Sequence, residues 1–317
     1  MLRRTMLMAA AVLTLAAPAQ ARTWRIAPDA DAEQQIAAAL ASAQAGDEVR
    51  LERGRYEMRA PLRMDARGVT LRGAGEDRSV LAFVGAQGGL VITGDMGVVR
   101  DLAIEDAPGD GVSARRCDQL SLLGVRVEWT RGGLPSNGAH AIAAAQCANV
   151  LIDGAIARGA RAAGFYLSQT RAVVLRNSTA EGNGAGVMLE NTLGADVHDN
   201  SVRNNALGVL VLNRPELGGG GEAGDVLIAK NMIEANSLAS FAPRGALPGD
   251  APGGVGVAII AGRNTHVLHN QIADNPSVNV FIGAYRGAVA QAGFNPLSRD
   301  IAVRDNRLGR SGFAPSG

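Results

Sequence analysis

The sequence predicts an all-β fold: a single-stranded right-handed parallel β-helix of about nine rungs with an N-terminal capping helix. The clearest evidence is that residues 171–192 and 193–212 follow one pattern, in which Leu175 corresponds to Val197. A repeat of about 22 residues cannot bury its own apolar face and must stack on its neighbours. Alternation of apolar and polar residues within each copy indicates that the stacked elements are strands.

The same repeat extends over residues 69–308. One aliphatic column, which we use as the marker of each rung, consists of Leu71, Val99, Leu122, Ile152, Leu175, Val197, Ile228, Val267 and Val303. A second column lies five residues after each marker and is aliphatic everywhere except at Glu76. The longer intervals between markers predict four surface insertions, at residues 128–137, 213–224, 234–254 and 283–297.

Composition agrees with one solenoid domain over residues 22–317. The chain has 317 residues, of which 41 are glycine and only 3% are aromatic, as expected for a narrow core with many tight corners. The formal net charge of +1 gives no reason to expect a nucleic-acid partner. The two cysteines and four histidines have no metal-site spacing, and no motif indicates a cofactor.

The first 21 residues are predicted to be a signal peptide. Arg3 and Arg4 precede an apolar run from Met6 to Ala17, and Ala19-Gln20-Ala21 is a small-x-small cleavage site. The apolar run is too short to span a membrane comfortably, and no later stretch could span one. We therefore expect a periplasmic or secreted protein without a membrane span.

Residues 29–45 are predicted to form a helix that covers the N-terminal end of the solenoid. Asp31 is expected to cap it, Ile36 and Leu40 to lie on its buried face, and Gly46 to end it. Such a cover is needed because a bare solenoid end exposes apolar side chains and unpaired backbone. The tail at 309–317 is too short for a second cap, so either the last loop or something else covers the other end.

Two polar columns are expected inside the stack. Asn200, Asn231, Asn270 and Asn306 occupy one position in successive rungs, which predicts a structural ladder of side-chain hydrogen bonds. Cys117 and Cys147 occupy equivalent positions in neighbouring rungs and should be within reach of a disulfide. A disulfide and a pair of buried free thiols are equally compatible with the pattern.

Two stretches resemble a known group of proteins. GDEVRLERGRY at 46–56, followed by GVTLRGAGEDRSVL at 68–81, is similar to the opening of pectate-lyase-like right-handed β-helix proteins. The stretch at 110–139 resembles exported bacterial β-helix repeat proteins, which are similar to the β-helix protein of nitrous oxide reductase maturation and, distantly, to mannuronan epimerases. The resemblance implies the fold and a periplasmic c-type cytochrome or other redox protein as a partner. The Asp-Pro-His-Asp signature of the epimerases is absent.

Alternation within the strands points His140 and Tyr166 outward as stacked neighbours, with Glu190 nearby. Removal of a proton next to a sugar carboxylate needs a base, an acid and a cation that neutralises the carboxylate. The candidate catalytic residues are therefore His140, Tyr166, Arg161 and Glu190, with Arg158 as an alternative cation.

The insertions at 128–137 and 234–254 are expected to form two rims around a trough. Its floor would carry His140, Tyr166, Met188 and Glu190. The candidate substrate-binding residues are Glu128, Trp129, Arg131, Asn137, Arg158, Glu181 and Asn183. Trp129 is expected either to stack on a sugar ring or to pack against its own rung.

Two functions agree with these residues. The first is a non-catalytic module that binds a polysaccharide, an oligosaccharide or a periplasmic protein along the solenoid. The alternative is a polysaccharide lyase or C5-epimerase that acts on a uronic-acid glycan. The fold does not choose between them, because one fold supports many functions.

Overall fold

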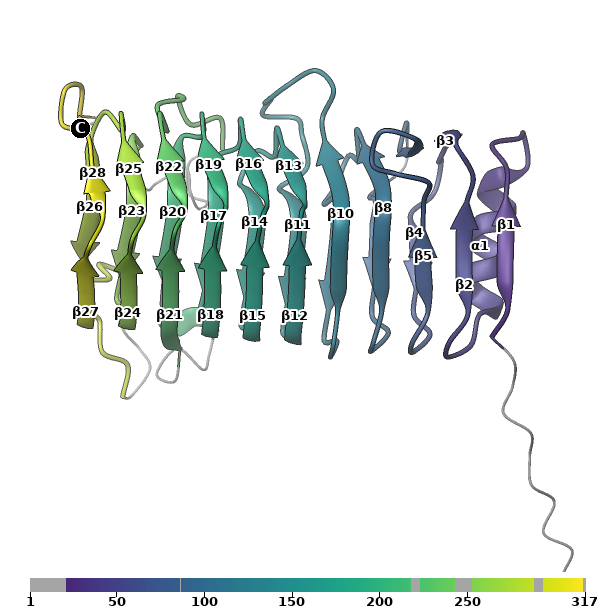
Figure 1. The fold of residues 1–317 in the computed structure, drawn as a ribbon, viewed down its shortest axis with the longest axis horizontal. Coiled ribbons are helices and arrows are strands. Elements are labelled where there is room, and N and C mark those ends of the chain that lie inside the picture. Colours follow the sequence, from purple (N-terminus) through teal and green to yellow (C-terminus); the bar gives the residue numbers. More distant parts are fainter. Residues whose placement is uncertain (1–20, 86, 218–222, 243–252, 288–292, 316–317) are drawn as a thin grey trace, which may run out of the picture.

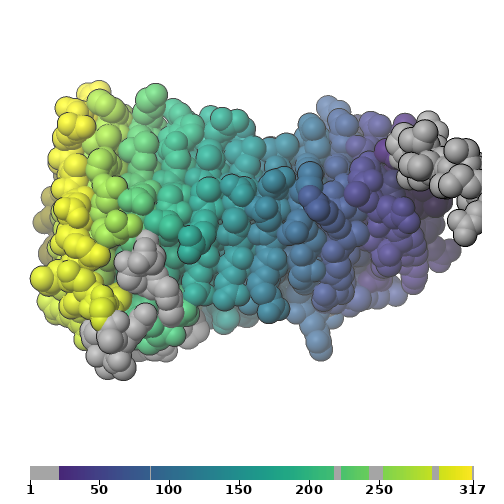
Figure 2. Space-filling model, turned by 90° about the horizontal axis from the view of Figure 1, so that it is seen from below, coloured from purple at the N-terminus to yellow at the C-terminus, as the bar shows by residue number. Residues whose placement is uncertain are grey.

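The protein is a single β-helix in the computed structural model, which describes residues 21–85, 87–217, 223–242, 253–287 and 293–315. Strands stack side by side along one axis, from the purple N-terminal end to the yellow C-terminal end (Figures 1 and 2). Every strand pairing is parallel, within one 19-stranded and one nine-stranded sheet. The predicted fold class is confirmed. The predicted signal peptide lies outside the described residues except for Ala21.

Each turn of the chain contributes to three faces. The first face comprises β1 (Thr23–Ile26), β2 (Glu48–Leu51), β5 (Thr70–Arg72), the first halves of β8 (Val98–Glu105) and β10 (Ser121–Glu128), β12 (Ala148–Asp153), β15 (Arg171–Arg176), β18 (Leu193–His198), β21 (Gly224–Ala229), β24 (Arg263–Leu268) and β27 (Arg299–Arg304). The second face comprises β3 (Gly54–Glu57), β6 (Ser79–Ala82), the second halves of β8 and β10, β13 (Ile156–Arg158), β16 (Thr179–Glu181), β19 (Ser201–Arg203), β22 (Met232–Glu234), β25 (Gln271–Ala273) and β28 (Arg307–Leu308).

The third face is the nine-stranded sheet. It comprises β4 (Leu62–Met64), β7 (Leu90–Ile92), β9 (Val112–Arg115), β11 (His140–Ala145), β14 (Ala163–Ser168), β17 (Ala185–Glu190), β20 (Leu207–Leu212), β23 (Val255–Ile260) and β26 (Val278–Gly283). A helix, α1 (Ala32–Ser42), and a 3₁₀ turn, η1 (Pro215–Leu217), complete the described elements.

The marker column has the predicted register. Leu71 pairs with Val99, Leu175 pairs with Val197, and the pairing continues to Val303. These side chains are buried in one continuous apolar core down to Val267. The first face also starts earlier than predicted, because Trp24 of β1 and Val49 of β2 continue the column toward the N-terminus.

The second column needs one correction. Leu81, not Glu76, pairs with Ile104 and is fully buried. In this rung the corner between β5 and β6 spans residues 73–78, so the chain reaches the second face later than the fixed spacing assumed.

Corners of the solenoid contain single residues in the left-handed region of φ. Asn177, Asp199, Lys230 and His269 precede equivalent second-face strands and have φ between 50° and 56°. Asn and Asp accept this conformation more readily than most residues. Sharp bends between short strands therefore recur at fixed positions along the chain.

The asparagine ladder is confirmed. The Nδ2 group of Asn200 donates to Oδ1 of Asn231 at 2.9 Å, and the same bond recurs from Asn231 to Asn270 at 3.0 Å and from Asn270 to Asn306 at 2.9 Å. A second ladder at the next corner was not predicted. It consists of Asn183, Asn205, Asn236 and Asn275, with equivalent bonds of 3.0, 2.9 and 3.1 Å.

The N-terminal cap is confirmed, with shorter bounds than predicted. Ile36 and Leu40 of α1 are buried against the first rungs. Asp31 precedes the helix without a side-chain capping bond, whereas Asp29 accepts hydrogen bonds from the Asp31 backbone and the Gln35 side chain. Extended backbone at Ala43 ends the helix ahead of Gly46.

Cys117 and Cys147 lie on neighbouring rungs, as predicted. Their Cα atoms are 4.6 Å apart, and the sulfurs form a disulfide. Within the described residues, no helix is long and apolar enough to cross a membrane.

Candidate functional site

A hollow of about 410 Å³ opens on the outer surface of the third face. It lies over β9, β11 and β14 and is bounded on one side by Leu217 of η1. The polar residues that line it are Asp110, Ser113, Arg115, Arg116, His140, Gln146, Tyr166, Ser168 and Gln169. We call it the third-face hollow.

His140 is held by Asp110. The Nδ1 atom of His140 is 3.0 Å from Oδ1 of Asp110, and the His140 backbone N–H donates to the same oxygen at 3.1 Å. With a proton on Nδ1, this contact fixes the imidazole ring and leaves the lone pair of Nε2 free. Such an arrangement of a carboxylate and a histidine is suited to general-base chemistry at Nε2.

Tyr166 stacks on His140, as predicted. The two rings are nearly parallel, at an angle of 11°, with their centroids 4.1 Å apart. The strands nevertheless place Ala143, rather than His140, opposite Tyr166. The stack is therefore diagonal between β11 and β14 and depends on the inclination of both side chains.

Glu190 fixes the other end of Tyr166. Its carboxylate accepts a hydrogen bond from the Tyr166 hydroxyl and lies 2.6 Å from Nε of Arg214. Burial of the phenol and the nearby Glu190 charge raise the pKa of Tyr166 above its usual range, so the hydroxyl keeps its proton. Glu190 is only 2% exposed. It therefore positions Tyr166 and cannot itself reach a bound molecule in this arrangement.

Two arginines give the third-face hollow its positive charge. Arg115 ends β9, Arg116 follows it at φ 51°, and both are exposed. Neither has a carboxylate partner among the described residues, and Arg115 makes only a long contact of 3.4 Å with Ser113. Guanidinium groups in this state are available to an anionic ligand.

The predicted trough over rungs four to six is not open in the structure. The chain after β20 folds back over the third face, where Asn191 and Arg214 exchange hydrogen bonds of 2.9 Å and Gln169 donates to the Leu217 carbonyl at 2.7 Å. Met188, expected on the floor, is only 3% exposed and lies in an apolar cluster with Leu210 and Ala258 of the following strands. The third-face hollow itself extends no farther along the stack of strands than β14.

The two expected rims approach each other. A Cβ atom built on Gly133 of the first insertion would be 2.7 Å from the Phe241 ring of the second, so these residues lie in close contact. The remainder of the second insertion, residues 243–252, lies outside the described residues. The described parts of the two insertions therefore meet, where the trough required an open gap between them.

Three predicted substrate-binding residues have structural contacts instead. Trp129 is 6% exposed and its indole N–H donates to the Ala107 carbonyl at 2.7 Å, so it packs against the solenoid rather than offering a face to a sugar. Asn137 is buried and donates to the carbonyls of Gly132 and Gly159. Asn183 is fully buried in the second asparagine ladder.

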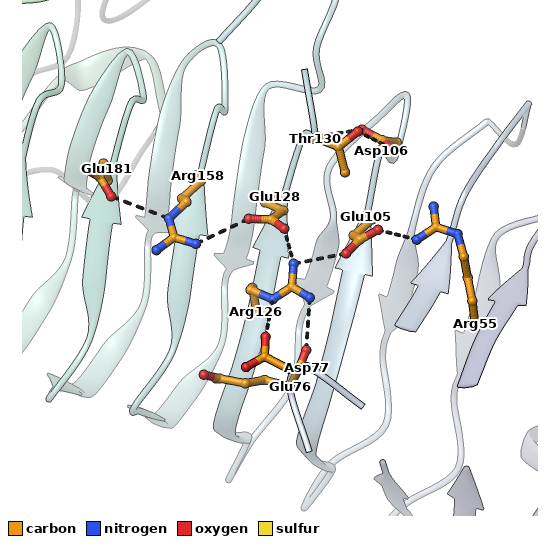
Figure 3. Close-up of polar contacts among 10 residues, drawn as sticks. All are labelled: Arg55, Glu76, Asp77, Glu105, Asp106, Arg126, Glu128, Thr130, Arg158 and Glu181. Atoms are coloured by element: carbon orange, nitrogen blue, oxygen red, sulfur yellow. Dashed lines mark hydrogen bonds and ion pairs between the residues drawn. The ribbon is translucent and has the colours of Figure 1, made fainter. Parts of the chain in front are cut away.

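Glu128, Arg158 and Glu181 belong to an ion-pair ladder on the second face (Figure 3). Arg158 lies 3.4 Å from Glu128 and 3.5 Å from Glu181. The ladder continues through Arg126, which contacts Glu128 and lies 3.0 Å from Glu105. Glu105 and Glu128 are opposite each other on neighbouring strands, and Arg126 contacts both carboxylates.

A second hollow of about 360 Å³ lies beside this ladder and includes Glu128, Trp129, Arg158 and Glu181. It shares no lining residue with the third-face hollow. Arg131 is exposed on the adjoining insertion.

Arg161 follows β13, with its backbone N–H bonded to the Gly138 carbonyl at 3.1 Å, and does not line the third-face hollow. Arg158 and Arg161, the candidate cations of the sequence prediction, do not line the hollow that contains His140. Arg115 and Arg116 line it instead, farther along the strands, since Arg115 is opposite Ala145, five residues along β11 from His140.

The described residues contain no group of three or more His, Cys, Asp or Glu side chains that could hold a metal ion. The side chains that line the third-face hollow include two guanidinium groups, an imidazole oriented by Asp110 and several hydroxyl and amide groups.

Comparison with a family model decides the family. The model described as the right-handed β-helix region matches residues 88–308. The chain belongs to the right-handed β-helix family. No curated protein matches the sequence.

Several solved structures have the same fold. An A-module of a mannuronan C-5 epimerase from Azotobacter vinelandii is 15% identical with a TM-score of 0.55, over 88% of this chain and 82% of that one. A pectate lyase is 15% identical with a TM-score of 0.51, over 93% and 82% of the two chains. The catalytic unit of an α-1,3-glucanase from Streptomyces thermodiastaticus is 19% identical with a TM-score of 0.54, over 96% of this chain and 51% of that one. At these identities the likeness concerns the fold alone.

Proposed function

We propose that this protein binds an acidic polysaccharide in the third-face hollow. The observation that carries the proposal is the pair of exposed arginines, Arg115 and Arg116, without carboxylate partners among the described residues, in the same hollow as an imidazole fixed by Asp110. A guanidinium group binds a carboxylate through two parallel hydrogen bonds, which favours uronic acids over neutral sugars. Two structural neighbours are a mannuronan epimerase and a pectate lyase, which supports a polyuronate as the ligand class.

Export is part of the same proposal and rests on the predicted signal peptide at residues 1–21. A polyuronate outside the cytoplasm would then be accessible to the solenoid. The comparisons give no support to a cytochrome or other redox partner, and we do not propose one.

The binding test is titration of the mature chain with polymannuronate, polyguluronate and polygalacturonate, with dextran as the neutral control. The paired variant Arg115→Ala/Arg116→Ala is expected to weaken binding by about tenfold or more, because each charge-assisted hydrogen bond contributes roughly 1.5–3 kcal/mol. Arg131→Ala is the matched control, since Arg131 is also exposed but lies on the corner insertion. Equal affinity of all three proteins for every polyuronate would refute the proposal.

A second candidate function, uronate lyase or C5-epimerase, is favoured by the contact between Asp110 and His140. Arg115 lines the same hollow but is opposite Ala145, five residues along β11 from His140, so its side chain would have to extend toward the imidazole to neutralise the sugar carboxylate and acidify the proton on the adjacent carbon. Nε2 of His140 would accept that proton, and the resulting imidazolium, stabilised by Asp110, could return it. Protonation of the leaving glycosidic oxygen by that imidazolium gives the unsaturated product of a lyase, whereas epimerisation requires a second proton donor, a water molecule or another side chain, on the opposite face of the carbon.

The catalytic test measures unsaturated product and solvent-deuterium incorporation with the polyuronate that binds best. His140→Ala should abolish either activity while binding persists. His198→Ala is the control, because His198 has a similar contact with Asp199 at 2.6 Å but lies on the first face. A polyuronate that binds without product or deuterium incorporation would leave the chain a binding module.

A further inference from the structure

The C-terminal end of the solenoid exposes side chains that are buried in every earlier rung. Val303 is 37% exposed and Leu308 is 55% exposed, whereas their partners in the preceding rung, Val267 and Ile272, are fully buried. On the third face, Ile282 is 49% exposed over the buried Ile259. The core therefore runs out to the surface at this end.

The backbone is also open there. The strands of the last turn, β26, β27 and β28, each pair on one edge only, with β23, β24 and β25 respectively. The opposite end is covered by α1, and within the described residues no comparable element covers the last turn (Figure 1). An exposed strand edge beside apolar side chains is a template for pairing with another chain.

The sequence of β27 indicates which chain fits. In an antiparallel pair, residues that face each other lie on the same side of the sheet. When a strand pairs in this way with the same strand of a second copy, one residue lies opposite the same residue of the other copy. With Ala302 at the centre, Ile301 of each copy faces Val303 of the other, and both residues belong to inward-pointing columns. A centre at Val303 would place Ile301 opposite Asp305 instead.

Charge agrees with the same register. Centring on Ala302 places Asp300 opposite Arg304 and Arg299 opposite Asp305, so two opposite-charge pairs flank the apolar centre on each side. Asp300 and Asp305 lie at the two bends of β27, with φ of 56° and 59°, and Arg304 is exposed. Opposed residues in an antiparallel pair are close enough for such side chains to interact.

We infer that the uncovered end is an interface between two copies of this chain, which join tail to tail through antiparallel pairing of their β27 strands. The two cores then form one continuous core, and the N-terminal caps and both third-face hollows remain free. A two-fold axis midway between the two Ala302 residues makes the interface self-complementary, which closes the assembly at a dimer.

The test is the molar mass of the mature chain, residues 22–317, by sedimentation velocity over a concentration series. The parent is expected to be a dimer. Val303→Asp should weaken the dimer by about a hundredfold or more, because it places an unpaired charge in the apolar centre. Val84→Asp is the control, since Val84 is 63% exposed far from this end, and it should leave the dimer unchanged.

Charge exchange tests the register. Asp300→Arg or Arg304→Asp alone places like charges opposite each other and should weaken the dimer. The double variant Asp300→Arg/Arg304→Asp restores opposite pairs between copies and should restore dimerisation, and circular dichroism confirms that each variant is folded. A monomeric parent, or a dimer indifferent to Val303→Asp, would overturn the proposal. Failure of the double variant to recover would overturn the register.

Discussion

Replacement of Asn231 by alanine tests how much the asparagine ladder contributes to stability. The Oδ1 atom of Asn231 accepts from the backbone N–H of Asn200 at 3.0 Å and from its Nδ2 group at 2.9 Å. Its Nδ2 group donates to the Val197 carbonyl at 2.8 Å and to Oδ1 of Asn270. Asn231 is 2% exposed, so water cannot easily replace these bonds.

The expected loss in the free energy of unfolding depends on which buried groups lose a hydrogen-bond partner. In Asn231→Ala, Asn200 keeps the bond from its Nδ2 to the Leu175 carbonyl, and Asn270 keeps the bond from the backbone N–H of residue 231. The Asn200 N–H loses the acceptor shown for it, and the Val197 carbonyl loses a donor. A buried polar group without a partner costs roughly 1–3 kcal/mol, so we expect a loss of about 2–4 kcal/mol in the free energy of unfolding.

Asn231→Ser is the matched control, because a serine, Ser178, occupies the equivalent position one rung before Asn200. The hydroxyl of Ser178 accepts from the Ala155 N–H at 3.0 Å, as Asn231 accepts from Asn200. Serine should therefore restore the acceptor and recover about 1 kcal/mol or more relative to alanine. Urea unfolding followed by circular dichroism measures both variants. Equal stability of the parent and Asn231→Ala, or of the two variants, would contradict the reasoning.

Three further predictions concern the cap, the corners and the ion-pair ladder. Burial and the charge of Glu52 raise the pKa of Tyr56 to about 12. The protonated Tyr56 hydroxyl should therefore contribute fully to stability below about pH 10, the pKa of the unfolded state, and this contribution should be lost between pH 10 and 12. Tyr56→Phe should cost about 1–3 kcal/mol at neutral pH and should lack that alkaline loss in melting curves. Gly194→Ala should cost about 1–2 kcal/mol because its φ is 71°, whereas Gly88→Ala, where nothing lies closer than 3.9 Å, should be neutral or slightly stabilising in the same urea assay. Arg126→Ala should cost about 3 kcal/mol, because the Arg126 side chain is 10% exposed between Glu105 and Glu128. Arg55→Ala should cost less than about 1 kcal/mol, because the Arg55 side chain is half exposed. Equal thermal stability of the two variants would show that burial does not govern the contribution of these ion pairs.

The fold could be predicted because a solenoid repeats its constraints. Leu175 and Val197 occupy equivalent positions under the same packing requirement, and a period visible in one pair extends along the chain. The prediction failed at Glu76 because the longer corner after β5 breaks the fixed spacing, which the sequence does not mark. The number of rungs at the N-terminal end was underestimated because α1 interrupts the repeat between β1 and β2.

The candidate site could be predicted only in part. The contact of His140 with Tyr166 was expected from a register that made them equivalent, whereas the strands place Ala143 opposite Tyr166 and His140 three residues earlier. Arg115 and Arg116 were missed because the third-face register was not followed back to β9. The burial of Trp129 depends on the path of a non-repeating loop, and periodicity carries no information about such a path.

The most direct measurement is the structure of the mature chain in complex with a short oligomer of the polyuronate that binds best. We expect one sugar carboxylate within hydrogen-bonding distance of the Arg115 or Arg116 guanidinium group, with the oligomer extending along the third face toward Nε2 of His140. An oligomer bound instead in the hollow of Glu128 and Arg158, or on the first face, would contradict the assignment of the site.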